Sequence, residues 1–140
     1  WKSELVKEVV NDLPHLKDRV KFLGFVSQQQ IAPLVAGARA LVLPSRYEGF
    51  GMPIVEAMAA GTPVLCSDRG ALPEVAGNAA QFFDANDVDR LKSLIEQLDE
   101  DDQMFDTMRQ AGLTRAKNFS WNKCAQETFS AYRQTIALSS

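Results

Sequence analysis

Apolar residues in the first part of the chain follow two alternating patterns. Some segments repeat apolar residues every three or four positions, as amphipathic helices do, and others are short continuous apolar runs bounded by turn residues, as buried strands are. The predicted helices cover residues 5–13, 27–37 and 53–60, with a short helical turn over 72–76, and the predicted strands cover 20–26, 40–44, 63–67 and 81–83. This order predicts parallel strands joined by helices.

Two local signals refine these elements. Ser27 and Gln30 fit a capping box that opens the second helix. The run over 40–44 has the continuous apolarity of a strand that is covered on both faces.

The pattern after Asp84 contains helices only. The three apolar stripes are Val88, Leu91, Leu94, Ile95 and Leu98, then Met104, Met108 and Ala111, and finally Trp121, Cys124, Ala125, Thr128, Phe129, Tyr132 and Ile136. Ser120 can cap the third helix, and the polar run 99–103 joins the first two. We interpret the Met and aromatic residues of these stripes as core residues.

Size and charge limit the kind of protein. A chain of 140 residues with 46% hydrophobic content predicts one domain with its own core. A net charge of -3 and a pI near 5.1 provide no general basic field. This balance argues against a general binder of nucleic acid or of anionic membranes, although a local basic patch remains possible.

The cysteines and the ends of the chain bear on location. Cys66 and Cys124 lack zinc-ligand spacing and suggest reduced thiols rather than a disulfide framework. The longest apolar-leaning run, 31–43, is too short to span a bilayer. Because the chain opens on Trp1 without a signal-peptide pattern, we interpret it as a piece of a longer protein, located in the cytoplasm or at the cytoplasmic face of a membrane.

The most informative segment is the bend and helix over 48–62. Gly49 and Gly51 let the backbone come close to a ligand, and Pro53 suits the first position of a helix. The first amides of that helix, at Gly51, Met52, Ile54 and Val55, have no partner one turn back. They therefore offer donors and partial positive charge to an anion or to hydroxyl oxygens.

Two carboxylates accompany this bend. Glu56 is the only charged residue of an otherwise apolar helix, so we expect it to be satisfied either by an internal cap or ion pair or by a ligand such as a ribose diol. Glu48 follows a buried strand, at the sheet edge where open α/β folds place their ligands. Taken singly, it could also be a solvated turn residue.

The segment as a whole resembles the donor-site motif of retaining glycosyltransferases of family 4, which have the GT-B fold. The resemblance is carried by residues 44–64, including Glu48 and Glu56 with positions 49–55 between them, and continues through 67–77, upstream through 20–26 and downstream through 119–121. It implies a Rossmann-like parallel sheet flanked by helices, with an all-helical C-terminal tail. The chain would then be most of the nucleotide-sugar-binding domain, with the first part of that domain and the N-terminal acceptor domain missing.

The resemblance also implies roles for individual residues. Glu48 would contact hydroxyls of the transferred sugar as the catalytic residue, and Glu56 would bind the nucleotide ribose. The backbone of Gly49, Phe50, Gly51 and Met52 would meet the sugar and diphosphate, and Val26 would border the base. The reaction transfers a hexose such as mannose or glucose from a nucleotide-diphosphate sugar with retention at the anomeric carbon, and it needs neither a metal nor another cofactor.

Parts of such an enzyme are absent from these residues. The acceptor, a glycan or a lipid-linked molecule, would bind mainly to the missing domain, and the basic pair that clamps the donor phosphates would precede this segment. We interpret Arg46 and Arg69 as solvated loop residues. We interpret Asp68 and Glu74 as turn and cap residues, although their loop would face the site and could touch the donor or acceptor. We therefore expect the 140-residue chain to fold, to bind donor weakly at best and to lack transferase activity.

Two other functions stay open at this point. A nucleotide-sugar epimerase or a phosphorylase could share the fold, and a non-catalytic domain could retain it as an interaction surface. The spacing of Glu48 and Glu56 favours the transferase, because nothing structural requires both carboxylates there. His15, beside Pro14, is interpreted as a surface histidine.

Overall fold

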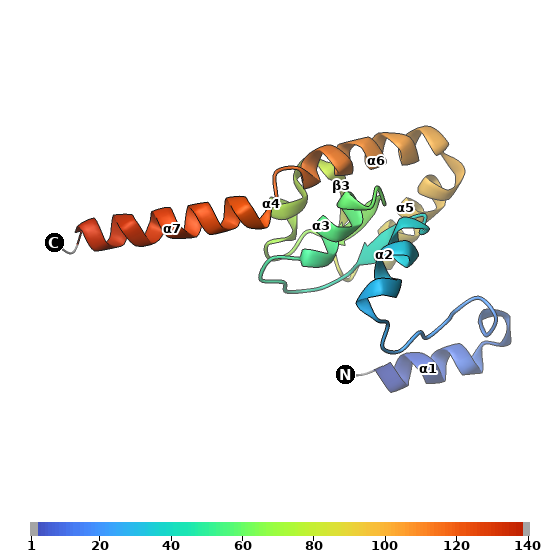
Figure 1. The fold of residues 1–140 in the computed structure, drawn as a ribbon. Coiled ribbons are helices and arrows are strands. Elements are labelled where there is room, and N and C mark those ends of the chain that lie inside the picture. The colour runs from blue at the N-terminus through green and yellow to red at the C-terminus, as the bar shows by residue number, and fades with distance from the viewer. Residues whose placement is uncertain (1–2, 139–140) are drawn as a thin grey trace. The chain divides into compact units, whose positions relative to one another are not determined.

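The computed structural model describes residues 3–138, which fall into two compact units, Trp1–Gln30 and Ile31–Ser140. Figure 1 labels the elements of both units. Each unit is described by itself.

The first unit contains one clear helix. α1 (Ser3–Asp12) has the predicted apolar spacing, and a 3₁₀ turn (Pro14–Leu16) follows it where Pro14 stops the helical pattern. Val10 is the buried hydrophobic residue of this helix, and Val9 remains 57% exposed. The unit therefore has little core of its own.

The predicted strand over 20–26 is wrong. These residues form an irregular segment, and Phe25 is 97% exposed. A strand needs a neighbour for its backbone hydrogen bonds, and none of the described residues pairs with this segment. The apolar run was bounded by turn residues as a strand would be, but that pattern says nothing about whether a partner is present.

The capping box at the start of α2 (Gln28–Ala36) is present in part. The Ser27 N–H donates to the Gln30 side chain over 3.4 Å, as the motif requires. The Ser27 hydroxyl donates to the same Gln30 oxygen over 2.9 Å instead of accepting from the helix. α2 continues through Pro33 and ends before Gly37, as predicted.

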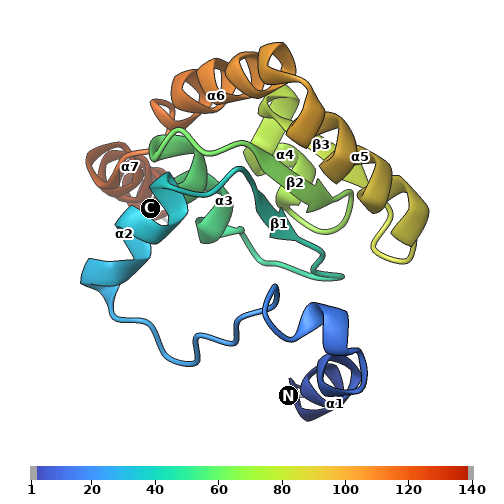
Figure 2. The same cartoon turned by 90° about the vertical axis from the view of Figure 1, so that its right-hand side faces the viewer.

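The second unit is built on a parallel sheet. Its strands β1 (Leu41–Leu43), β2 (Val64–Ser67) and β3 (Ala80–Phe83) lie in the order β1-β2-β3, with Leu41 opposite Val64 and Val64 opposite Ala80. The connections are α3 (Met52–Ala59) and α4 (Leu72–Ala76), the latter followed by a 3₁₀ turn (Gly77–Ala79). Figure 2 shows the strands between α3 and α5. The predicted α/β architecture with parallel strands is confirmed.

The central strand β2 is buried on both faces. Successive side chains of a strand point to opposite faces, so Val64 and Cys66 join a cluster with Ile54 of α3, while Leu65 joins a second cluster with Leu98. The edge strand β1 differs, because Val42 is 36% exposed. The expectation that 40–44 is covered on both faces is therefore wrong: the helices that cover Leu65 do not extend over its neighbour Val42.

Two capped helices complete the layer that covers β2 and β3. The Asp87 side chain accepts the Arg90 N–H at the start of α5 (Val88–Glu100), and Asp101 accepts the Met104 N–H at the start of α6 (Asp102–Ala116), each over 2.9 Å. The predicted connection over 99–103 shrinks to Asp101, the one residue between the two helices.

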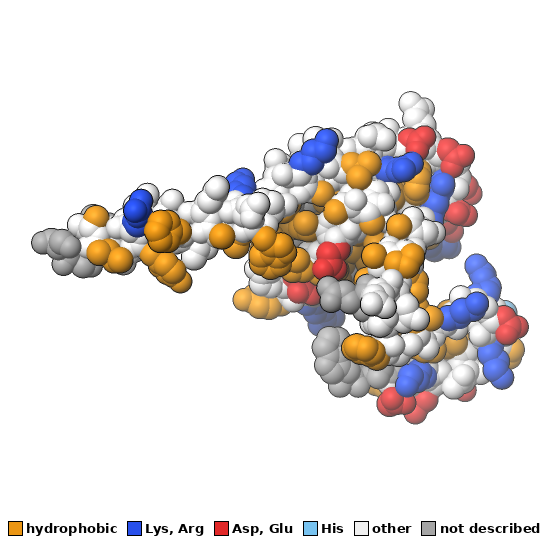
Figure 3. Space-filling view, viewed as in Figure 1, with side chains coloured by type: hydrophobic (Ala, Val, Ile, Leu, Met, Phe, Trp, Pro, Cys, Tyr) orange, Lys and Arg blue, Asp and Glu red, His pale blue; other side chains and the backbone are white. Residues whose placement is uncertain are grey.

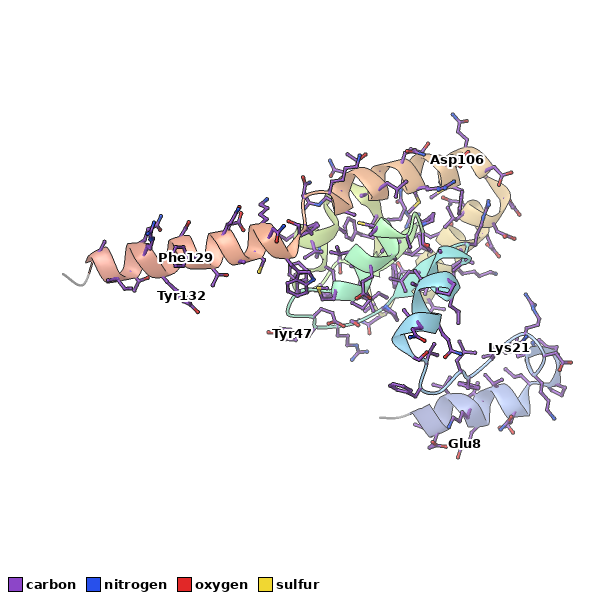
Figure 4. All side chains as sticks on the ribbon, viewed as in Figure 1. Glu8, Lys21, Tyr47, Asp106, Phe129 and Tyr132 are labelled. Carbon is purple, nitrogen blue, oxygen red and sulfur yellow. The ribbon has the colours of Figure 1, made fainter. Side chains whose placement is uncertain are left out.

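The last helix, α7 (Trp121–Leu138), lies on none of these layers. Ser120 caps it as predicted, accepting the Lys123 N–H over 3.1 Å, yet every described side chain over 121–137 is exposed. Figure 1 shows α7 projecting from the end of α6, and Figure 4 shows Phe129 and Tyr132 along it. The interpretation of its aromatic residues as core residues is therefore wrong within the described chain.

Candidate active site

The loop from β1 to α3 turns sharply at Gly51. Gly51 has φ of 96°, a left-handed conformation, and a Cβ added there would lie 2.6 Å from a methyl carbon of Leu72. Both features require glycine. α3 begins at Met52, one residue before the predicted Pro53, which occupies its first turn. The predicted glycine-flanked bend before a helix is confirmed.

The start of α3 offers fewer amides than the sequence suggests. The Ile54 N–H donates to the Gly51 carbonyl over 2.9 Å, so this amide is already used. The N–H groups of Gly51 and Met52 donate to no acceptor among residues 3–138. Gly51 is buried, whereas Met52 and Gly49 are exposed, so the amides of Met52 and Gly49 are the ones in a position to face a ligand.

Only one oxygen of the Glu48 carboxylate has a hydrogen-bond partner among the described residues. Glu48 is half-buried, and its Oε1 accepts a hydrogen bond of 2.8 Å from the Ser45 hydroxyl. Its carbonyl accepts the Ala71 N–H over 3.3 Å. Within the described part of the chain, Oε2 accepts no hydrogen bond. The preceding residue, Tyr47, is 83% exposed (Figure 4), so the loop carries Glu48 to the surface of the unit.

Glu56 lies on the exposed face of α3. Ile54, Ala57 and Met58 are buried, and position 56 falls on the opposite side of the helix from them because successive residues rotate by about 100°. Its carboxylate makes no hydrogen bond or ion pair with the residues that the structure describes. The internal cap or ion pair is thus absent there, and the carboxylate is accessible to a ligand or to water.

Two other predicted donor-site residues, Phe50 and Met52, belong to the same bend. Phe50 and Met52 are each 42% exposed, and the Phe50 ring meets Phe119 edge-on with centroids 5.8 Å apart. Val26 is half-buried and belongs to the first unit. Its predicted contact with the base stays a prediction.

Three neighbouring loops at the carboxyl edge of the sheet are joined by polar contacts. Arg69, after β2, forms ion pairs with Asp68 (3.1 Å) and with Asp84, which follows β3. Arg46, after β1, donates to Asn86 over 2.8 Å. Hydrogen bonds from the Asn86 backbone and from Arg69 lower the pKa of the Asp84 carboxyl below its usual range. Arg46 and Arg69 are exposed loop residues, as interpreted from the sequence, and each also pairs with a polar side chain of the loop after β3.

A groove of about 580 Å³ lies beside the bend. Phe50, Met52 and Val55 form one wall of this groove. The other wall comes from the start of α7 and the residues before it: Asn118, Phe119, Ser120, Trp121, Lys123, Cys124, Glu127 and Thr128. Figure 3 shows hydrophobic side chains gathered where α7 joins the rest of the unit. The sequence did not reveal this groove, because it arises from segments far apart in the chain.

Over 3–138, no three His, Cys, Asp or Glu side chains are grouped so that they could hold a metal ion. None of the described helices combines the length and apolarity needed to cross a membrane.

Comparisons with known proteins identify the family. The family model "Glycosyl transferases group 1" matches residues 11–115. The chain is 45% identical over 114 residues to O-antigen chain mannosyltransferase B of Escherichia coli, covering 81% of this chain and 30% of that protein. It is 37% identical over 126 residues to the MMP alpha-(1->4)-mannosyltransferase of Mycolicibacterium hassiacum, covering 87% of this chain and 31% of that protein. The chain thus spans about a third of the length of these relatives.

Solved structures agree with this assignment. Sucrose-phosphate synthase of Thermosynechococcus elongatus superposes with a TM-score of 0.86 at 29% identity, over 98% of this chain and 35% of that one. HepE of Anabaena, solved in complex with UDP, superposes with a TM-score of 0.79 at 29% identity, over 93% of this chain and 38% of that one. The predicted fold class, a Rossmann-like parallel sheet of the GT-B type with a helical tail, is confirmed. The chain belongs to the group 1 family of glycosyl transferases.

Proposed function

We propose that the complete protein transfers a hexose, with mannose as the first candidate, from a nucleotide-diphosphate sugar to a glycan or lipid-linked acceptor with retention of anomeric configuration, as retaining enzymes of family 4 do. The observation that carries the proposal is Glu48. Its carboxylate is anchored by Ser45 through one oxygen, beside a glycine bend in which Gly49 and Met52 are exposed and the Met52 amide is unpaired among the described residues. The mannosyltransferase relatives and the UDP complex of a structural neighbour support the choice of sugar and donor.

Different described residues would contact the sugar, the ribose and the diphosphate of the donor. Glu48 would accept hydrogen bonds from hydroxyls of the transferred sugar. The exposed carboxylate of Glu56 would accept hydrogen bonds from the two hydroxyls of the ribose. The amides of Gly49 and Met52, at the bend and the start of α3, would stabilise negative charge on the departing diphosphate. Catalysis of this kind rests on orientation and charge stabilisation, and we propose that it uses no metal.

The 140-residue chain alone is not the enzyme in this proposal. The acceptor domain and the basic pair that would clamp the phosphates lie outside it, and Arg46 and Arg69 are engaged with Asn86 and Asp84. Isothermal calorimetry of this chain with GDP-mannose and UDP-glucose should show at best weak binding. Micromolar affinity would show that the site is complete without the missing clamp.

The test of the catalytic role uses the complete protein and the substitution Glu48→Gln. Loss of one such group typically lowers turnover about 10²- to 10³-fold, and we expect a loss of this size in kcat with radiolabelled donor and a membrane or glycan acceptor fraction. Glu96→Gln, an exposed carboxylate on α5 paired with Lys92, is the matched control and should leave kcat unchanged. Near-normal transfer by Glu48→Gln would end the proposal.

A second variant separates binding from chemistry. Glu56→Gln should raise KM for the donor about 10-fold with little change in kcat, because the ribose is bound equally in the ground and transition states. A fall in kcat without a change in KM would contradict the assignment of Glu56 to the ribose.

The same assays address the other functions and the location. Conversion of the donor sugar without any acceptor would identify an epimerase, and no donor-dependent reaction at all would identify an interaction domain. We place the enzyme in the cytoplasm or at the cytoplasmic face of the membrane, where fractionation of cells should find it.

A further inference from the structure

We propose that Ser45 and Gly70 are positioning residues of the transfer reaction: Ser45 holds the Glu48 carboxylate from within the same loop, and Gly70 supports the Glu48 backbone from the loop after β2. The inference rests on the proposed catalytic role of Glu48. Neither residue belongs to the bend itself: Ser45 follows β1 and Gly70 follows β2.

Ser45 acts on the carboxylate. Its hydroxyl donates to Glu48 Oε1 over 2.8 Å, so one oxygen of the carboxylate is fixed while the other remains available. Both residues are half-buried, so water competes less for this hydrogen bond than it would on an open surface. A hydrogen bond to a charged group restricts the rotation of the side chain that accepts it.

Ser45 is itself held by the core. The hydroxyl of Ser67, the last residue of β2, donates to the Ser45 carbonyl, and Ser67 is fully buried. The position of Ser45 is therefore set by the central strand of the sheet. The chain of contacts runs from β2 through the Ser45 backbone to the Glu48 carboxylate.

Gly70 acts on the backbone of Glu48. It has φ of 59°, and a Cβ added there would lie 3.0 Å from the Glu48 carbonyl oxygen and 3.1 Å from its nitrogen. The next residue, Ala71, donates its N–H to the same Glu48 carbonyl over 3.3 Å. The contact is with backbone rather than with a flexible side chain, so any substitution must displace Glu48 or the loop that carries Gly70.

The first test compares two serines in the complete protein. Ser45→Ala should lower kcat about 10-fold with little change in KM for the donor, since it removes a hydrogen bond to a charged group. Ser45→Thr restores the hydroxyl and should recover most of the loss. Ser93→Ala is the matched control, because Ser93 is also half-buried and its hydroxyl accepts one side-chain hydrogen bond of 2.9 Å, from Gln97 on α5.

A double-mutant cycle distinguishes positioning from a structural role. If Ser45 acts through Glu48, then Ser45→Ala should cost about 10-fold in the native background and less than about 2-fold in the Glu48→Gln background. A merely structural serine would cost the same in both. Equal costs, or an effect of Ser45→Ala no larger than that of Ser93→Ala, would overturn the role of Ser45.

The second test compares two glycines. Gly70→Ala and Gly61→Ala both place a side chain at positive φ, but the added Cβ at Gly61 meets the exposed side chain of Arg109 at 3.2 Å instead of the Glu48 backbone. The two variants should show similar losses in melting temperature, while Gly70→Ala alone lowers kcat, by about 10-fold or more. Equal kcat values for folded Gly70→Ala and Gly61→Ala would overturn the role of Gly70.

The outcomes also separate this inference from the function on which it rests. Full activity of Glu48→Gln ends both. A strong loss with Glu48→Gln, combined with a neutral and non-coupled Ser45→Ala and a neutral Gly70→Ala, keeps the transferase and removes the positioning residues.

Discussion

α6 and α7 carry apolar residues at similar spacing, yet only one of them is packed. Met108 and Ala116 of α6 are buried, and Gly112 lies so close to α3 that an added Cβ would meet Met58 at 3.2 Å. In α7, Trp121 is 79% exposed and Tyr132 is 66% exposed. The comparison shows that an apolar stripe predicts an amphipathic helix. It does not predict whether another element of the chain packs against the apolar face.

The largest expected difference between buried and exposed positions is in the reactivity of the two cysteines. Cys66 lies in the buried cluster that also contains Ala116 of α6, and burial raises the pKa of its thiol from 9.0 to about 12, whereas Cys124 lies exposed on α7. With iodoacetamide at pH 8, we expect Cys124 to react at least about 100-fold faster than Cys66 in the folded 140-residue chain, because the thiolate is the nucleophile.

Peptide mapping by mass spectrometry would measure the two rates. In denaturant both thiols should react alike, which serves as the control. Because the folded pKa of Cys66 is the raised one, its contribution to stability is complete below pH 9 and is lost as the pH rises toward about 12. Equal labelling of both cysteines in the folded chain would contradict the buried position of Cys66.

Truncation of one side chain on each helix gives the next largest difference. Met108→Ala removes a buried side chain and should lower the free energy of unfolding by about 2 to 5 kcal/mol. Phe129→Ala, at a position 59% exposed, should change it by less than about 0.5 kcal/mol. Urea unfolding of the 140-residue chain measures both. A large cost for Phe129→Ala would show that α7 is packed in solution, either within the chain or against a second copy.

The N-cap residues of α6 and α7 form the most closely matched pair of substitutions, and we expect the smallest difference in unfolding free energy between them. Asp101→Ala removes the cap of α6 and should lower the free energy of unfolding by about 1 kcal/mol. Ser120→Ala removes the cap of α7 and should leave the urea midpoint nearly unchanged, while hydrogen exchange of the first amides of α7 becomes faster. Equal shifts in the urea midpoint would show that α7 unfolds together with the sheet.

The sequence predicted most elements of the second unit, since strong local signals accompany them. Gly51 and Pro53 mark the start of α3, and the continuous run before Ser67 marks a strand buried on both faces. The segment over 20–26 had a similar apolar run and is irregular. The physical difference is the partner: β2 pairs with β1 and β3, whereas residues 20–26 pair with no described strand.

The site was predictable in its identity and less so in its geometry. Glu48 and Glu56 stood out through their spacing around a glycine bend, but the sequence left open whether Glu56 has an internal partner, and its position on α3, opposite Ile54 and Met58, leaves its carboxylate exposed. Ser45 and Gly70 had no signal of their own. Ser45 contacts Glu48 within one irregular loop, whose conformation its sequence does not specify, and Gly70 contacts Glu48 from the next loop, a contact that has no fixed spacing in the chain.

The sequence by itself determined which helices and strands the sheet unit contains, in which order, and which acidic residues accompany the bend. These features depend on neighbouring residues: turn glycines, a proline at a helix start and the period of apolar positions. The tertiary structure alone decided which faces are covered, which oxygen of Glu48 is anchored and which is left available, and that α7 is exposed. Burial and side-chain hydrogen bonds depend on segments distant in the chain, and only the folded backbone brings those segments together.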